Sequence, residues 1–307
     1  MKNKRIFVLG YFGFYNPGDD IMVEIIKDNF REFNLIFLVK KNYYKVKIIK
    51  RYNLIKFFYK FRKGDVLINS GGIFQDVTSL RSFFYYFFMN LIVILKKGKI
   101  ISLNIDAVDI KRKITFKAFN YILKNSTLTI FRDRESFKMF KKKYNNIYFL
   151  PDIVFIYKII KKRNKFLYDR LFNPVKNIDI KKIDFSIRDI LVINKGEESI
   201  LKNLKIFNKN IFIYNYHNMM DLLDLISRSK IVITGRYHIA ILSIIFNKVI
   251  YLFNLSNKIL ELSKEYKINF YEKNIDSKNK SNYNIINITE IKKEWNVMIK
   301  KIKREIR

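Results

Sequence analysis

The stretch that decides the fold is Val232-Ile233-Thr234-Gly235-Arg236-Tyr237-His238-Ile239-Ala240. An apolar run ends at a glycine and an apolar helical pattern begins at once, which predicts a strand, a tight turn and a helix. Such a turn presents unpaired backbone N–H groups at the positive end of the helix dipole, so it is a ready anion site. The fork of Arg236 suits a phosphate or a carboxylate. His238 can move protons near neutral pH.

A simpler interpretation of the same turn stays open. Arg236 would pair with a surface carboxylate, and His238 would only cap or pack against the helix. The chain contains only 2 histidines, which gives the position of His238 more weight than usual.

The same strand–turn–helix pattern opens the chain. Residues 5–9 form an apolar run, residues 10–20 are rich in glycine, and a helical pattern runs from Ile21 to Phe30. A third apolar run, residues 65–69, ends in Ser70-Gly71-Gly72 and leads to an aromatic helix from about Ser79. In open α/β sheets, ligands sit at such turns. The glycine spacing is not GxGxxG, so a dinucleotide fingerprint is absent.

Strands alternate with helices along most of the chain, which predicts α/β folding with mostly parallel, doubly wound sheets. We place an N-terminal Rossmann-like domain at 1–156, a linker at 157–182, a C-terminal Rossmann-like domain at 183–288 and a basic amphipathic helix at 289–307. The strands expected in the first domain are 5–9, 35–39, 65–69, 99–103, 127–131 and 147–150. Those expected in the second are 183–187, 211–214, 230–234 and 249–253.

Composition bounds the class of protein. The 307 residues are 49% hydrophobic, which is ample for packed cores, and there is no cysteine, which fits a reducing compartment. No run is long enough to span a bilayer, and the N-terminus reads as a strand and not as a signal peptide. The protein is therefore expected in the cytoplasm. A net charge of +34 favours an anionic partner, although codon bias offers a second explanation.

The C-terminal segment carries Ile291, Trp295, Met298, Ile302 and Ile306 on one face between lysines and arginines. Two interpretations are open for this helix. It packs back onto a domain, or it docks on the inner face of the membrane, where anionic headgroups would attract its charge.

Six short motifs in order resemble the polysaccharide pyruvyl transferase family, nearest to its cell-wall polymer branch. They are Gly10 to Asp20, Ser70 to Ser79, Phe131 to Ser136, Pro151 to Phe155, Phe185 to Arg188 and Gly235 to Ala240. The resemblance runs from about residue 5 to 260. It implies two Rossmann-like halves facing a cleft, similar to GT-B glycosyltransferases. It also implies transfer of a pyruvyl group from phosphoenolpyruvate to a sugar of a cell-surface polysaccharide or its lipid-linked precursor, forming a ketal.

The resemblance also implies site residues. Phosphoenolpyruvate would be held by Arg188, Arg236 and His238, with Gly235 forming the turn. Phosphoenolpyruvate carries phosphate and carboxylate on one carbon, so its site needs two fixed cations, and we expect Arg236 and Arg188 to supply them from neighbouring strands. No cofactor or metal is expected.

We expect the acceptor to be bound by N-terminal loops that end strands. Their residues are Gly13, Asn16, Gly18, Asp19, Gly71, Gly72, Gln75 and Asp76. His238 is the candidate general acid, and Asp19 or Asp76 would act as a base or orient a sugar hydroxyl. Structural roles remain open for these residues, because both aspartates also suit helix caps and the glycines suit tight turns. Arg132 and Asp133 are expected to form a structural ion pair.

Two other functions compete with pyruvyl transfer. A GT-B glycosyltransferase using a nucleotide sugar would share the architecture, and Arg236 would then bind a diphosphate. A non-catalytic basic protein bound to membrane or nucleic acid is supported by charge alone, and no run matches a nucleic-acid module, so we expect no nucleic-acid partner.

Overall fold

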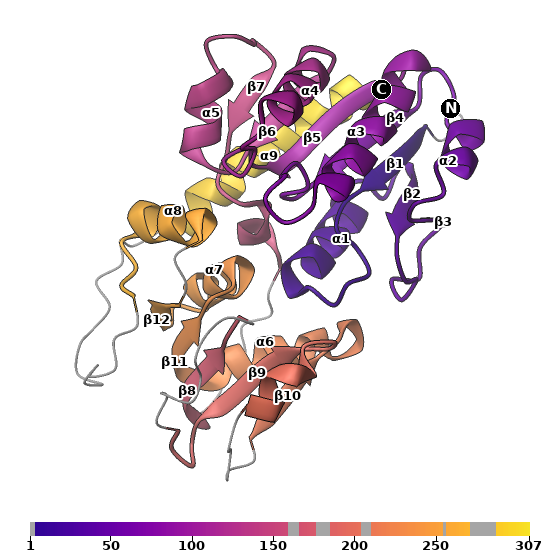
Figure 1. Ribbon diagram of the computed structural model, residues 1–307. Helices are drawn as coiled ribbons and strands as arrows, with labels where there is room; N and C mark the ends of the chain where they lie inside the picture. The colour runs from indigo at the N-terminus through magenta and orange to yellow at the C-terminus, as the bar shows by residue number, and fades with distance from the viewer. Residues whose placement is uncertain (1–3, 159–165, 176–184, 204–209, 254–255, 271–286) are drawn as a thin grey trace. The chain divides into compact units, whose positions relative to one another are not determined.

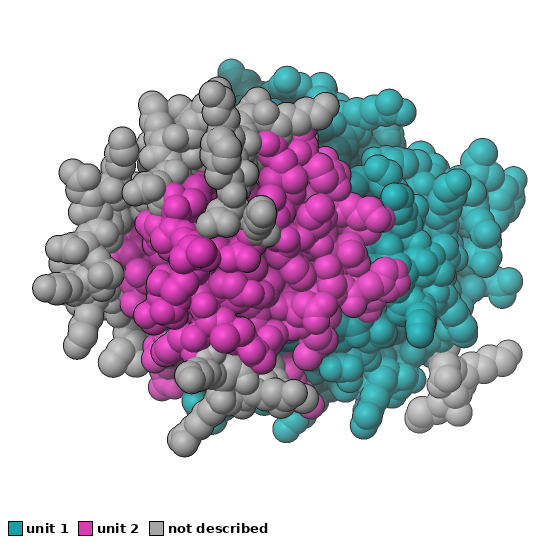
Figure 2. All heavy atoms as spheres, turned by 90° about the horizontal axis from the view of Figure 1, so that it is seen from below, with its two compact units in different colours: residues 1–14, 19–157, 289–307 teal, residues 15–18, 158–288 magenta. Residues whose placement is uncertain are grey.

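The structure is a computed structural model that describes residues 4–158, 166–175, 185–203, 210–253, 256–270 and 287–307. The chain divides into two compact units, each built around a parallel β-sheet (Figures 1 and 2). The first unit takes residues 1–14, 19–157 and 289–307, and the second takes residues 15–18 and 158–288. The expected α/β fold with two Rossmann-like units is confirmed.

The sheet of the first unit has seven strands in the order β3-β2-β1-β4-β5-β6-β7. These strands are β1 (Arg5–Leu9), β2 (Asn34–Val39), β3 (Ile48–Lys50), β4 (Val66–Ser70), β5 (Lys99–Ile105), β6 (Leu128–Phe131) and β7 (Ile147–Phe149). Every neighbouring pair is parallel. The chain order reverses between β1 and β4, and this switch point is where open α/β sheets bind ligands.

Helices cover both faces of this sheet. They are α1 (Pro17–Asn29), α2 (Leu54–Lys60), α3 (Leu80–Leu95), α4 (Lys113–Lys124), α5 (Arg134–Phe140) and α9 (Ile288–Ile306). The connection through α1 runs along the sheet in the opposite direction to those through α2, α3, α4 and α5. Because parallel crossovers are right-handed, α1 lies on one face and the other four lie on the opposite face. A large apolar cluster under α2–α5, including Phe57, Phe83 and Phe119, forms the core on that side.

Helix α9, drawn in yellow in Figure 1, returns to the first unit. Its apolar side chains are buried: Ile291, Trp295, Ile299, Ile302 and Ile306. The indole Nε1 of Trp295 donates a hydrogen bond of 2.8 Å to the carbonyl of Pro151. The apolar face therefore packs on the protein, and the interpretation in which this face docks on a membrane is wrong.

The sheet of the second unit has five parallel strands in the order β10-β9-β8-β11-β12. The strands are β8 (Tyr168–Asn173), β9 (Ile190–Asn194), β10 (Ile211–Tyr214), β11 (Ser229–Thr234) and β12 (Val249–Leu252). The helices are α6 (Met219–Arg228), α7 (Tyr237–Ile245) and α8 (Asn257–Tyr266). The order reverses between β8 and β11, so the turn after β11 again lies at a switch point.

Two boundaries expected from the sequence are wrong. Strand β8, at the centre of the second sheet, lies inside the segment 157–182 that was expected to be a linker. The strand was not recognised in the sequence because it contains charged residues. One of them, Arg170, forms an ion pair of 2.6 Å with Asp189. The expected strand 183–187 falls partly outside the described residues, and residues 185–189 form a loop that leads into β9.

In the parts of the chain that are described, no helix is both long enough and apolar enough to cross a bilayer.

Candidate active site

The turn between β11 and α7 is fixed by hydrogen bonds to the neighbouring strand β8. The N–H of Gly235 donates to the carbonyl of Asn173 over 3.1 Å. The hydroxyl of Thr234 donates to the Asn173 side chain over 3.0 Å and accepts from the N–H of Arg236, also over 3.0 Å. The end of the strand, the turn and the start of the helix are therefore held as one unit at the switch point.

Gly235 and His238 complete this turn. A Cβ on Gly235 would lie 3.2 Å from both methyl groups of Val175 and 3.5 Å from the Cβ of Phe253, so a glycine allows the close approach of these segments. His238 lies half-buried in the first turn of α7, with its ring centre 5.3 Å from that of Tyr237. An imidazole is thus placed at the N-terminus of a nine-residue helix, where backbone N–H groups attract anions.

Arg236 is the N-terminal cap residue of α7, and its guanidinium forms an ion pair with Glu197. Its Nε is buried and has no hydrogen-bond partner among the described residues. Burial lowers the pKa of Arg236, and Glu197 opposes that shift. A buried donor without an acceptor is costly, so this nitrogen marks a position where an anionic ligand would be stabilised. The simpler interpretation, a carboxylate partner for Arg236, is also confirmed by the Glu197 pair.

Arg188 does not join Arg236. It lies before β9, its carbonyl accepts from the N–H of Asp169, and its Nε is 3.5 Å from the Asp169 carboxylate. Asp169 also pairs with Lys230, the second residue of β11, whereas Arg236 follows the end of the same strand. The two arginines therefore lie at opposite edges of the sheet. The expectation of one shared site is wrong because Arg188 precedes its strand and does not follow one.

Lys195 is a cation that sequence reasoning missed, and it follows a strand at the same edge of the sheet as Arg236. Lys195 comes directly after β9, and its N–H donates to the carbonyl of Tyr214 at the end of β10. Glu197, the partner of Arg236, lies two residues further on. The signal was available, because residues 190–194 are a mostly apolar run followed by a lysine and a glycine, and a glycine also follows the strands at the other candidate turns.

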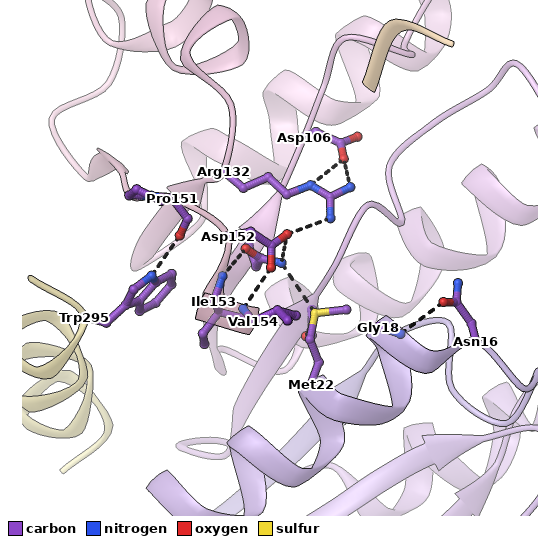
Figure 3. A network of polar contacts seen from close by, with 12 residues as sticks. Asn16, Gly18, Met22, Asp106, Arg132, Pro151, Asp152, Ile153, Val154 and Trp295 are labelled. Atoms are coloured by element: carbon purple, nitrogen blue, oxygen red, sulfur yellow. Dashed lines mark hydrogen bonds and ion pairs between the residues drawn. The ribbon is translucent and has the colours of Figure 1, made fainter. Parts of the chain in front are cut away.

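The turn after β1 is held in part by the hydroxyl of Tyr44. Gly13 has a φ of +85°, and its N–H donates to the hydroxyl of Tyr44 over 2.9 Å. Tyr44 in turn donates to Asp20, and burial together with that carboxylate raises the Tyr44 pKa. The side chain of Asn16 accepts from the N–H of Gly18 over 3.2 Å at the start of α1 (Figure 3).

Asp19 is buried in the first turn of α1 and lies against the turn after β4. A Cβ on Gly71 would be 3.3 Å from the Asp19 carboxylate and 3.0 Å from the Met22 methyl group. Gly71 itself has a φ of +79°, which other residues rarely adopt. The structure therefore brings Asp19, Gly71 and the adjoining Gly72 together at the β1/β4 switch point.

Asp76 has a structural role. It accepts from the N–H groups of Lys111 and Arg112 over 3.0 and 2.9 Å and from the hydroxyl of Thr115, so it caps the start of α4. Burial by itself would raise its pKa, but these hydrogen bonds outweigh burial and lower it. A fully bonded carboxylate that resists protonation is a poor general base. The side chain of Gln75 is also engaged locally, because its amide oxygen accepts a hydrogen bond from the N–H of Thr78.

The prediction that Arg132 pairs with Asp133 is wrong, because Arg132 pairs with two other aspartates. Arg132 is buried and bonds to Asp106, with Nε 3.0 Å from the carboxylate, and to Asp152 over 3.2 Å (Figure 3). Asp133 instead caps α5 by accepting from the N–H of Ser136. Burial raises the Asp133 pKa to about 6. The motif residues around 132 and 152 thus hold the strand ends together from inside the unit.

Arg51 is a second residue that sequence reasoning missed. It is buried and donates to the carbonyl of Gly10 over 3.0 Å. Its guanidinium carbon lies 5.0 to 5.5 Å from five aromatic ring centres, those of Tyr11, Phe14, Tyr52, Tyr85 and Tyr86. These cation–π contacts fix the start of the loop that follows β1. Only the fold reveals the cage, because its residues come from three separate segments.

Comparison with solved structures shows the fold. UDP-GlcNAc 2-epimerase from Methanocaldococcus jannaschii, in complex with UDP-GlcNAc and UDP, aligns with a TM-score of 0.59 at 11% identity, over 96% of this chain and 99% of the epimerase. The Rickettsia bellii enzyme gives 0.60 at 11% identity, over 98% and 95%. The Neisseria meningitidis enzyme bound to UDP-GlcNAc gives 0.59 at 11% identity, over 98% and 92%. The chain therefore has the GT-B-like fold of these epimerases.

Comparison of sequences places the chain more narrowly. No curated protein matches it. The profile of the family described as polysaccharide pyruvyl transferase, in contrast, matches residues 16–257, which include the β4–α3 and β11–α7 turns described above and begin at the last residue before α1. On that match, the chain belongs to the polysaccharide pyruvyl transferase family.

Proposed function

We propose that the protein transfers a pyruvyl group from phosphoenolpyruvate to a sugar of a cell-surface polysaccharide or of its lipid-linked precursor, with formation of a ketal. The observation that carries the donor assignment is Arg236, whose buried Nε has no partner within the described residues, at the N-terminus of α7. Family membership supports the reaction class. A lipid-linked acceptor would place the reaction at the cytoplasmic face of the membrane.

The donor site is proposed to use two cations from neighbouring turns. Arg236 would bind the phosphate or carboxylate of phosphoenolpyruvate through its free Nε, together with the N–H groups of α7. Lys195, which follows β9, would take the place that the sequence analysis gave to Arg188. Glu197 holds the guanidinium of Arg236 in position, and the ligand would compete with Glu197 for part of the positive charge of Arg236.

The proposed chemistry balances without a further reactant. The methylene carbon of phosphoenolpyruvate gains a proton, two sugar hydroxyl oxygens bond to the central carbon, and the bond from that carbon to the phosphate oxygen breaks. Of the two hydroxyl protons, one replaces the proton given to the methylene carbon and the other leaves with phosphate. His238 is proposed as the general acid. Asp19 is proposed to orient or deprotonate a hydroxyl of the acceptor.

A nucleotide-sugar reaction is the second candidate. The fold resembles that of epimerases solved with UDP-GlcNAc or UDP, and a helix N-terminus with an arginine also suits a diphosphate. The two candidates differ in the donor that the second unit would bind.

Thermal unfolding of the full chain with phosphoenolpyruvate, inorganic phosphate or UDP-GlcNAc distinguishes the donors, because a ligand that binds the native state stabilises it by mass action. We expect phosphoenolpyruvate to give the largest shift. Arg236→Ala should weaken its binding by about 10- to 100-fold, since a charge-assisted contact contributes about 1.5–3 kcal/mol. Arg236→Lys should restore binding only in part.

Arg188→Ala is the matched control, because it removes an arginine of the same unit from the opposite edge of the sheet. It should leave the shift by phosphoenolpyruvate unchanged. A larger shift by UDP-GlcNAc would favour the second candidate, and equal losses in both alanine variants would place the donor site elsewhere. Phosphate release from phosphoenolpyruvate, measured with membranes that carry lipid-linked glycans, then tests the transfer itself.

A further inference from the structure

Three segments of the first unit contain no acidic residue. They are residues 33–64, 77–105 and 110–132, and they include α2, α3 and α4 in full. All charges on these helices are positive: Lys56, Lys60, Arg81, Lys113, Lys117 and Lys124. Helix α1 on the other face carries Asp19, Asp20, Glu24 and Asp28. Codon bias toward lysine raises the number of cations everywhere, but it does not explain why acids are absent from α2, α3 and α4 while α1 and α5 carry them.

The same face exposes large apolar side chains. On α2, Ile55 is 73% exposed and Tyr59 is 76% exposed, although Phe57 on the same helix is buried. On α3, the stripe Phe84, Phe88, Leu91 and Leu95 follows the helical spacing i, i+4, i+7, i+11, and every member is half-buried or exposed. Leu95 at its end is 69% exposed. Soluble proteins rarely expose such apolar stripes without a partner.

The two helices form one surface. The ammonium group of Lys96, which follows α3, lies 4.0 Å from the ring centre of Phe58 on α2. Tyr52, before α2, packs its ring 4.8 Å from Tyr85 of α3. We define the α2–α3 face by its exposed apolar residues, Tyr52, Ile55, Phe58, Tyr59, Phe88 and Leu95. Its basic residues are Lys56, Lys60, Arg62, Lys63, Lys96 and Lys97.

We propose that the α2–α3 face docks the protein on an anionic membrane surface. The exposed rings and aliphatic side chains would enter the boundary between headgroups and acyl chains, and the surrounding lysines would contact anionic headgroups. Charge complementarity favours an anionic membrane over a second copy of this chain as the partner. A second copy meeting the same face across a twofold axis would place lysine against lysine, with no acid on either side. Docking deepens the proposed function in one respect, since it would bring the enzyme to a lipid-linked acceptor.

Sedimentation of the full chain with vesicles tests this proposal without any donor or acceptor. The protein should bind vesicles of phosphatidylglycerol and phosphatidylcholine, and binding should fall as salt rises, because exposed charges are screened. Vesicles of phosphatidylcholine alone should retain little protein. The charge-reversal variant Lys56→Glu/Lys60→Glu should bind the anionic vesicles at least about tenfold more weakly.

The matched control is Lys293→Glu/Lys300→Glu on α9, where both lysines are exposed and the change in net charge is the same. It should reduce binding less than about threefold, because it leaves the docking face intact. Equal losses in the two variants would mean that net charge alone drives binding, and they would overturn the proposal. Negligible binding of the unaltered chain to anionic vesicles at low salt would overturn it too.

Light scattering of the unaltered chain without lipid tests the second-copy alternative. A dimer that Lys56→Glu/Lys60→Glu strengthens would replace the membrane by a second copy as the occupant. Stabilisation of each variant by phosphoenolpyruvate, measured in parallel, keeps the two proposals separate. If a variant loses vesicle binding but is still stabilised by phosphoenolpyruvate, the loss concerns the docking face alone. If phosphoenolpyruvate stabilises none of the variants, the result concerns the proposed donor.

Discussion

Helix α9 and the α2–α3 face share an amphipathic pattern, but one apolar stripe is buried and the other is exposed. Both combine lysines with an apolar stripe, and both invite a membrane interpretation. The stripe of α9 is buried, with Trp295 fully enclosed, whereas Ile55 and Tyr59 on α2 are largely exposed. The charges differ too, since α9 carries Glu290, Glu294 and Glu305 and the α2–α3 face carries no acid. An amphipathic pattern therefore shows that an apolar face exists, and the fold decides what covers it.

The largest expected effect is on stability, at α9. Trp295→Ala should lower the free energy of unfolding by about 3–5 kcal/mol, because it removes a fully buried indole and leaves a cavity. Denaturant unfolding measures the change. The folded variant should still bind anionic vesicles like the unaltered chain. Val297→Ala is the control, since that α9 side chain is 65% exposed and should change stability by less than about 0.5 kcal/mol.

The next effect is on vesicle binding, at the α2–α3 face. Ile55→Ser/Tyr59→Ser should weaken binding to anionic vesicles by about tenfold or more, because two apolar side chains no longer enter the lipid boundary. Stability should change by less than about 0.5 kcal/mol per site. Co-sedimentation and denaturant unfolding on the same preparation test both parts. A large loss of stability with unchanged vesicle binding would reverse the roles assigned to the two regions.

A smaller effect separates packing from hydrogen bonding at α9. Trp295→Phe keeps an aromatic ring but removes the donor to the Pro151 carbonyl. The free energy of unfolding should fall by about 1–3 kcal/mol, because the half-buried carbonyl loses its partner. Comparison with Trp295→Ala in one denaturant series gives the two contributions. A loss as large as that of the alanine variant would show that the hydrogen bond, and not the volume of the ring, dominates the contribution of Trp295.

The smallest effect depends on pH. Lys303 on α9 pairs with Glu32 over 2.7 Å. Burial would raise the Glu32 pKa, but the hydrogen bond from Lys303 contributes to a net lowering. A lowered folded-state pKa adds stability above the unfolded-state pKa of 4.5, and that stability is lost as pH falls through the folded-state pKa. Lys303→Ala should therefore cost less than about 1 kcal/mol at pH 7, because the pair is partly exposed, and progressively less as pH falls through the folded-state pKa of Glu32. A cost that does not depend on pH would contradict the ion-pair interpretation.

The sequence by itself determined the α/β class, the family and the turns that carry the candidate site residues. Strand–turn–helix patterns are local, and the turns at Gly10, Gly71 and Gly235 lie at the carboxyl ends of their strands because parallel sheets place them there. The apolar runs of β1, β4 and β11 are buried on both sides, so their apolar composition alone predicts that they are strands. Short or charged elements such as β8 and α2 lack that signal.

Only the tertiary structure decided which side chains meet. Arg188 and Arg236 both lie in stretches that resemble family motifs, yet they lie at opposite edges of the second sheet, because one precedes a strand and the other follows one. Asp76 became a helix cap when the fold brought the start of α4 to it. Helical spacing along a segment fixes which residues share a face. Packing against distant segments then decides whether that face is buried, as at Trp295, or left exposed, as at Tyr59.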